Sequence, residues 1–123
     1  MTRRIVRALQ HPRVHILGHP TGRLIGKREP YAVDMAAVVT AARDYGVCLE
    51  INAQPDRLYL NDVHIAMARQ AGVTLVISTD AHRIDELAWM QHGVDQARRG
   101  WCEAKDIANT GRLAAFRAFV ARK

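Results

Sequence analysis

The segment Val73-Thr74-Leu75-Val76-Ile77-Ser78-Thr79-Asp80-Ala81-His82 decides the fold and points to the chemistry of this chain. Its first part, Val73 to Ser78, is nearly all apolar or β-branched, a composition typical of a strand buried on both faces. Its second part adds a carboxylate, Asp80, and an imidazole, His82, directly after the strand. In α/β proteins the functional residues follow the carboxyl ends of the strands, so this segment predicts both a central strand and a candidate site.

Two apolar runs upstream repeat this arrangement. Residues 14–17 run into Gly18-His19, and residues 47–52 run into a turn around Pro55. Between the runs, apolar residues recur at helical spacing. Helices are expected at 3–10, 31–45, 61–70, 82–99 and 112–122, and the Gly- and Pro-rich residues 18–30 are expected to form a loop. Strands alternating with helices predict an α/β fold with parallel strands and flanking helices, arranged as a barrel or a doubly wound sheet.

Length and composition set limits on this fold. The 123 residues suit one domain, and 49% hydrophobic and 24% charged residues are close to the values of an ordinary soluble protein. The net charge of +6 favours a polyanionic partner such as nucleic acid or a phosphate-bearing substrate, with a solvated basic surface as the alternative.

The sequence also bears on the location of the chain. No apolar run is long enough to cross a membrane, and the first residues lack the apolar region of a signal peptide. We therefore expect a cytoplasmic protein without a membrane partner. Cys48 and Cys102 are too far apart for a metal or redox motif, and are expected to be free thiols.

Candidate metal ligands follow the predicted strands. His19 follows the first strand, Glu50 alternates onto one face of the second, and Asp80 and His82 follow the third. Residues two apart in an extended chain point to the same face, so Asp80 and His82 could share a divalent ion, with His19 as a further ligand. Such mixed sets suit zinc, manganese or iron. The alternative is that Asp80 caps the next helix and His82 is an ordinary residue of its first turn.

Three other residues at these strand ends have two interpretations each. Glu50 could orient a metal ligand from behind, or could belong to an internal ion pair. Arg23 and Arg57 could hold a substrate phosphate, or could be surface charges. The remaining histidines, His11, His15, His64 and His92, show no partnered spacing and are expected to be structural.

Together these segments resemble the PHP domain of bacterial family X DNA polymerases. The likeness covers almost the whole chain and is carried by Ile16 to Leu24, Arg28 to Tyr31, Glu50 to Ala53, Pro55 to Leu58, Asn61 to His64, Ile77 to His82 and Ala97 to Trp101. The resemblance implies a distorted (β/α)₇ barrel with up to three metal ions in a cleft at its rim.

The resemblance also implies roles for individual residues. His19, Asp80 and His82 would be metal ligands, and Asp80 and His82 would be catalytic. The activity implied is that of a manganese-dependent 3′–5′ exonuclease that processes DNA ends in base excision repair, with zinc or iron as alternative metals. From their position at the rim and their chemistry, we expect Arg23, Asn52 and Arg57 to contact the DNA backbone or a terminal phosphate.

The pattern of this family is only partly present. Its early H-x-H motif is missing, so residues 1–123 are expected to be the C-terminal half of a PHP domain, without the N-terminal half and the polymerase domain. Such a partial barrel would expose sheet edges and an apolar face and would favour self-association. Two alternatives remain for the function: a phosphomonoesterase of the histidinol-phosphatase type, or an inactive fragment that binds DNA weakly.

Overall fold

A computed structural model describes residues 1–27, 29 and 31–123 of the chain. Arg28 and Pro30, which belong to the predicted loop 18–30 and to one of the quoted motifs, lie outside the described residues.

The described chain contains a parallel sheet of three strands, which confirms the predicted α/β class. The strands are β1 (Ile16–Leu17), β2 (Cys48–Asn52) and β3 (Leu75–Ser78), in the order β1-β2-β3. Ile16 pairs with Cys48 across the first boundary and Asn52 pairs with Ser78 across the second. The register aligns the carboxyl ends of β2 and β3, and the described strands form an open sheet, as expected for part of a barrel.

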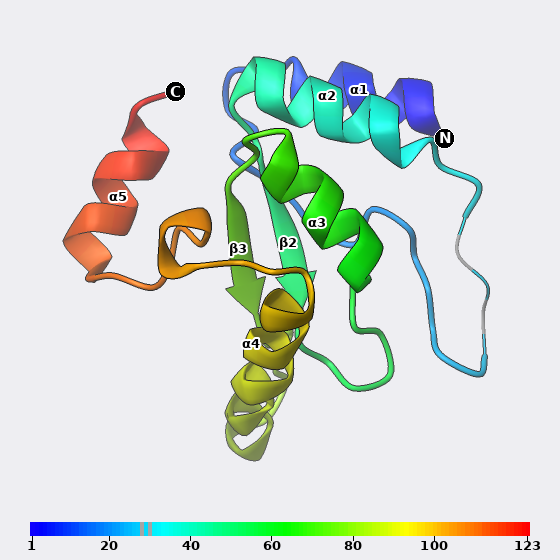
Figure 1. The fold of residues 1–123 in the computed structure, drawn as a ribbon, viewed down its shortest axis with the longest axis vertical. Helices are drawn as coiled ribbons and strands as arrows, with labels where there is room; N and C mark the ends of the chain where they lie inside the picture. The colour runs from blue at the N-terminus through cyan, green and yellow to red at the C-terminus, as the bar shows by residue number, and fades with distance from the viewer. Residues whose placement is uncertain (28, 30) are drawn as a thin grey trace.

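Helices occupy the connections between these strands (Figure 1). The connections contain α2 (Met35–Tyr45) and α3 (Asp62–Gln70), while α1 (Thr2–Leu9) precedes β1. After β3 come the 3₁₀ turn η1 (Ile84–Trp89), α4 (Met90–Arg99), the 3₁₀ turn η2 (Ala104–Asp106) and α5 (Leu113–Ala121). α2 begins later than predicted because the Asp34 carboxylate accepts the Ala37 N–H and so fixes the first turn. Residues 82–99, predicted as one helix, are divided between η1 and α4.

The core lies between the sheet and the packed helices. Leu49, Ile51 and Leu75 have no exposed surface. In Figure 1, α1 and α2 cover the amino end of the sheet, opposite to the arrowheads. α4 approaches the sheet at Gly93, where a Cβ atom would lie 2.4 Å from the Ile77 Cγ2 atom. Any side chain at Gly93 would therefore push α4 away from β3.

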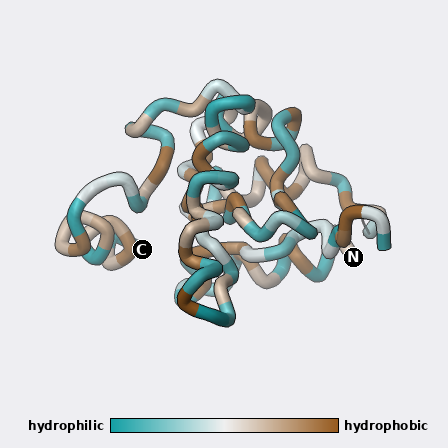
Figure 2. The backbone as a smooth tube through the Cα atoms, turned by 90° about the horizontal axis from the view of Figure 1, so that it is seen from below, coloured by the Kyte–Doolittle hydropathy of each residue, from teal (hydrophilic) through white to brown (hydrophobic). Residues whose placement is uncertain are grey.

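The C-terminal helix α5 differs from the other helices. It contains no buried residue, although most of its side chains are apolar, and it stands apart from the rest of the chain in Figures 1 and 2. Ile16, on the edge strand β1, also keeps 40% of its surface exposed.

Among the described helices there is none with the length and apolar character needed to span a bilayer.

Candidate metal centre

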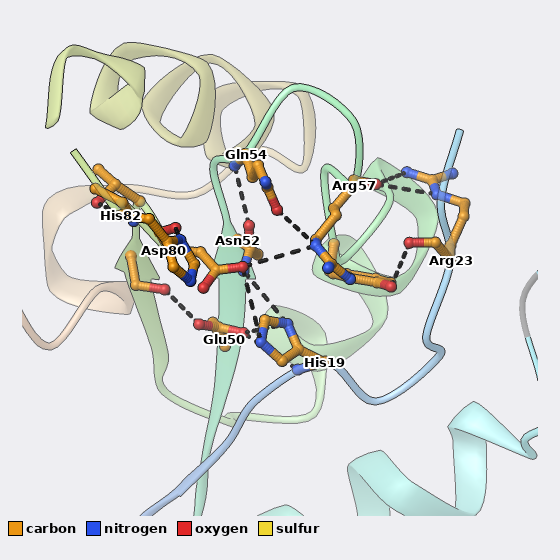
Figure 3. Close-up of polar contacts among 12 residues, drawn as sticks. His19, Arg23, Glu50, Asn52, Gln54, Arg57, Asp80 and His82 are labelled. Atoms are coloured by element: carbon orange, nitrogen blue, oxygen red, sulfur yellow. Dashed lines mark hydrogen bonds and ion pairs between the residues drawn. The ribbon is translucent and has the colours of Figure 1, made fainter. Parts of the chain in front are cut away.

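Side chains from all three strand ends meet at the carboxyl edge of the sheet (Figure 3). His19 follows β1, Glu50 lies on β2 and Asp80 follows β3. The two ring nitrogens of His19 face opposite partners: Nδ1 lies 3.4 Å from the Glu50 Oε2 atom, and Nε2 lies 4.0 Å from the Asp80 Oδ2 atom. The imidazole therefore stands between two carboxylates that come from the other two strands.

The backbone at both ends of this cluster is in the left-handed region. His19 has a φ of 50° and Asp80 a φ of 53°. This conformation costs a residue with a Cβ atom roughly 1–2 kcal/mol, although Asp, Asn and His tolerate it better than most. Such strained residues concentrate at functional sites, where the surrounding structure holds them in place. Periodicity and composition gave no sign of this feature.

Glu50 is fixed from both sides. Its Oε1 atom accepts a short hydrogen bond from the Ser78 hydroxyl, and its Oε2 atom accepts the backbone N–H of His19 at 3.1 Å. Only 12% of its side chain is exposed. Gly18 allows this approach, since a Cβ atom there would lie 3.2 Å from the Glu50 Oε2 atom. The carboxylate is thus held directly behind the imidazole, in the position of a group that orients a ligand.

Asn52 is fully buried beside the same imidazole. Its Oδ1 atom accepts the Gln54 N–H at 2.9 Å, which directs its Nδ2 group toward the His19 Nδ1 atom at 3.3 Å. The Nδ1 atom can accept from Asn52 in one tautomer, or donate to Glu50 in the other. The second tautomer leaves the Nε2 lone pair directed toward Asp80. The burial of Asn52 favours a positioning role over the predicted DNA contact.

Arg57 places a positive charge on the far side of Asp80. Its Nε atom lies 3.7 Å from the Asp80 Oδ2 atom, the same oxygen that faces His19. Arg57 also donates to the Gln54 side chain. About a quarter of each partner remains exposed, 27% for Arg57 and 23% for Asp80. A phosphate could therefore reach this guanidinium, and the predicted substrate contact stays a prediction.

Arg23 supports the loop that carries Arg57. Its guanidinium donates to the carbonyl of Arg57 at 3.0 Å and to that of Leu58 at 2.7 Å, and the Tyr59 hydroxyl donates back to the Arg23 carbonyl. Leu58 itself has a φ of 44°, so this loop is also strained. These bonds tie the segment after β1 to the segment after β2. The predicted phosphate contact of Arg23 stays a prediction, and its Nε and Nη2 groups donate to backbone carbonyls.

The His82 ring contacts the backbone of Asp80. Its Nδ1 atom lies 2.8 Å from the Asp80 carbonyl oxygen, and its backbone N–H donates to Glu86 at 2.7 Å. The described residues contain no group of three or more His, Cys, Asp or Glu side chains that could hold a metal ion. His19 and Asp80 are brought together, and a metal-ligand role for His82 remains a prediction.

The alternative in which Asp80 caps the following helix is wrong. The next helical segment, η1, begins after Arg83, which makes no side-chain capping bond. The Asp80 carboxylate instead faces the ring of His19 and the guanidinium of Arg57. Its position is explained by the site rather than by helix capping.

The other candidates for acid–base or thiol chemistry lie apart from this cluster. Burial, together with the nearby Arg23 charge, lowers the pKa of His64. Burial and the Asp106 carboxylate raise the pKa of Cys102 to about 11, and burial raises that of Cys48. Both thiols are free, as predicted, and both stay protonated at neutral pH, which excludes them as strong nucleophiles.

The fold and these residues define a class: an α/β protein with a histidine–carboxylate cluster at the carboxyl edge of a parallel sheet. No protein-family model matches the sequence. The chain is 45% identical over 120 residues to the DNA polymerase/3′-5′ exonuclease PolX of Bacillus subtilis strain 168, an alignment that covers 98% of this chain and 21% of PolX.

Proteins named probable phosphatases are also similar. One from Shewanella oneidensis is 34% identical over 102 residues, and one from Caldanaerobacter subterraneus is 28% identical over 87 residues. The chain spans about a fifth of PolX and about a third of these phosphatases. These relatives confirm the resemblance to the PHP domain of bacterial family X DNA polymerases.

Proposed function

We propose that this chain forms the metal-binding carboxyl edge of a phosphoesterase that acts on DNA 3′ ends. The observation that carries this proposal is the His19–Asp80 pair, with Glu50 held behind the imidazole. The relative named as a polymerase and 3′-5′ exonuclease supports a DNA substrate. The net charge of +6 supports the same choice, because the DNA backbone is a polyanion.

The chemistry of the pair fits a divalent transition metal. Imidazole nitrogen and carboxylate oxygen together suit manganese, zinc or iron. The His19 Nε2 and Asp80 Oδ2 atoms, 4.0 Å apart, would have to approach each other to hold one ion through two bonds of roughly 2.0–2.2 Å at a tetrahedral angle. When bound, such an ion would polarise a phosphoryl oxygen and lower the pKa of a coordinated water. We propose manganese as the working ion.

The pair supplies too few ligands for a complete site. Structural zinc sites use four ligands, and octahedral ions use six, some of them water. His82 could add one after rotation about its side-chain bonds. Further ligands would come from the parts of the longer relatives that this chain does not span.

Two residues, Glu50 and Arg57, prepare the site for an anionic substrate. Glu50 fixes the plane of the His19 ring through its bonds to Ser78 and to the His19 N–H. Arg57 lies beside Asp80 and would hold a phosphate oxygen next to the metal-binding pair. In this proposal the substrate phosphate and Asp80 share the Arg57 charge. We propose the processing of DNA ends in base excision repair as the corresponding role.

The test is manganese-dependent shortening of a 3′-labelled single-stranded oligonucleotide by the purified chain. The proposal expects cleavage, or at least manganese-dependent binding of the oligonucleotide, and expects both to be lost in Asp80→Ala and His19→Ala. A chain that binds the oligonucleotide equally well with and without manganese, in all variants, would contradict the proposal and favour weak charge-driven DNA binding.

A second candidate is a phosphomonoesterase, favoured by the relatives named as probable phosphatases. The same His19–Asp80 pair would serve a small substrate of the histidinol phosphate type. Histidinol phosphate and the labelled oligonucleotide, offered in parallel, distinguish the two. Hydrolysis of histidinol phosphate without loss of label would replace the DNA proposal by this one.

A further inference from the structure

A groove of about 670 Å³ lies at the opposite end of the sheet from His19 and Asp80. Its walls are the segment 12–15, which leads into the amino end of β1, and one side of α5. The lining side chains are Pro12, Arg13, His15, Phe116, Arg117, Val120, Ala121 and Lys123. None of these side chains is acidic.

The two walls of this groove are joined at the C-terminal end of α5. The Lys123 ammonium donates to the carbonyl of Val14 at 2.5 Å. The Arg122 guanidinium packs over the Phe119 ring, 4.0 Å from its centre, and lies near Gly46, just before β2. The helix is thus attached at one end, while the side chains that face the groove remain available.

The groove combines an apolar floor with a cationic rim. Phe116 and Val120 are half-buried, one helical turn apart on the same side of α5. Arg13 and Arg117 are exposed beside them. Residues 107–123 contain Arg112, Arg117, Arg122 and Lys123 and no Asp or Glu, so the sequence offers no local counter-charge.

We propose that this groove binds an acidic amphipathic segment of another protein chain. Apolar side chains of the segment would contact Phe116 and Val120, and flanking carboxylates would pair with Arg13 and Arg117. The concave apolar floor fits inserted side chains of a peptide, as in helix-in-groove recognition. Opposite charges at the rim would steer the segment into place and select it over neutral segments.

The cationic rim also argues against a second copy of this chain in the same groove. Two copies facing each other through this surface would bring Arg13, Arg117 and Lys123 against their equivalents. Each chain carries a net charge of +6, which adds to this repulsion. Nucleic acid would satisfy the charges, but it would leave the half-buried apolar floor without a matching surface.

The test is the binding of a fluorescein-labelled synthetic peptide with leucines at helical spacing and flanking glutamates. Binding is measured by fluorescence anisotropy with the full 123-residue chain, and compared with a peptide in which every glutamate is glutamine. We expect the acidic peptide to bind about tenfold or more tightly than its glutamine form, and to weaken as salt is raised.

Charge reversal locates the binding surface. The double variant Arg13→Glu/Arg117→Glu should lower the affinity for the acidic peptide by about tenfold or more. The matched control is Arg3→Glu/Arg7→Glu, which changes the net charge equally on exposed positions of α1. Phe116→Ala should also weaken binding, without loss of helical circular dichroism, because no residue of α5 is buried.

Four results would overturn this proposal. The first is equal affinity for the glutamate and glutamine peptides, and the second is an equal loss in the two double variants. The third is tighter binding of a poly-dT oligonucleotide or of anionic lipid vesicles, provided that this binding depends on Arg13 and Arg117. The fourth is a dimer in sedimentation velocity that dissociates in the groove variant.

Discussion

The two ends of the sheet carry opposite chemistry. At the carboxyl end, Asp80 and Glu50 surround His19, and the backbone is strained at His19 and Asp80. At the amino end, Arg13 and Arg117 rim an apolar groove whose lining has no acidic side chain. In our proposals the first end binds a cation and a phosphate, and the second binds a carboxylate-bearing segment. If both proposals hold, one short parallel sheet separates two binding functions, and changes at the two ends act independently.

A large, graded loss of metal binding that would sharpen this comparison is expected from Glu50→Gln. Loss of the charge behind the imidazole should lower manganese affinity by about 10–100-fold, because the partners of metal-bound histidines tune the ligand. The glutamine has the same shape and can still accept the His19 N–H. Isothermal titration calorimetry measures the affinity, and the control is Glu103→Gln, an exposed residue remote from the strand ends. Equal affinities in the two variants would remove Glu50 from the site.

A smaller effect, on folding, is expected from Asn52→Ala. The substitution leaves the part-buried Gln54 N–H without its 2.9 Å acceptor and removes a fully buried amide, which should cost about 1–3 kcal/mol of unfolding free energy. Urea denaturation followed by circular dichroism measures this loss. Asn109→Ala is a useful comparison, since Asn109 is exposed but also bonds to the sheet, at Ile77. A change at Asn52 below that at Asn109 would contradict the role assigned to the buried amide.

The backbone strain at Asp80 predicts an unusual order of stabilities. The free energy of unfolding of Asp80→Gly should exceed that of Asp80→Ala by about 1–2 kcal/mol, because glycine adopts a φ of 53° without steric cost. At Asp85, an exposed residue of η1, the order should reverse, since glycine is the poorer helix former. The same order at both positions would show that Asp80 is not strained.

The smallest effect concerns His64 and pH. Its pKa is lowered from 6.5 on folding, so the unfolded chain binds a proton more readily than the folded one. Stability from this group is complete above the unfolded pKa and decreases as the pH falls through that value. Between about pH 7.5 and pH 5.5, the His64→Gln variant should lose less stability than the parent chain. An identical loss in the two proteins would exclude this contribution.

The sequence predicted the elements better than the contacts between them. The β-branched run at 73–78 and the helical spacing of the apolar residues gave the strands and most helices, because these patterns are local. The split of residues 82–99 into η1 and α4 was not predicted, since no break in the pattern marks it. The first turns of α2 and α3 are each fixed by one hydrogen bond, to the side chain of Asp34 and of Asn61 respectively.

The candidate site, too, could be predicted only in part from the sequence. That His19, Glu50 and Asp80 would share one edge followed from the carboxyl ends of parallel strands. The positive φ of His19 and Asp80, and the turn of His82 toward the Asp80 carbonyl, depend on packing across strands and could not be derived from spacing. The groove beside α5 was missed for a related reason: α5 reads as an ordinary apolar helix, and its lack of burial appears only in three dimensions.

The most direct test of the account is manganese binding by the intact chain, measured by electron paramagnetic resonance for the parent and two variants. The account predicts that Asp80→Ala abolishes bound manganese but leaves the affinity for the acidic peptide unchanged. It predicts the opposite pattern for Arg13→Glu/Arg117→Glu. If Asp80→Ala binds manganese as well as the parent chain does, the carboxyl edge is not a metal site and the division between the two ends fails.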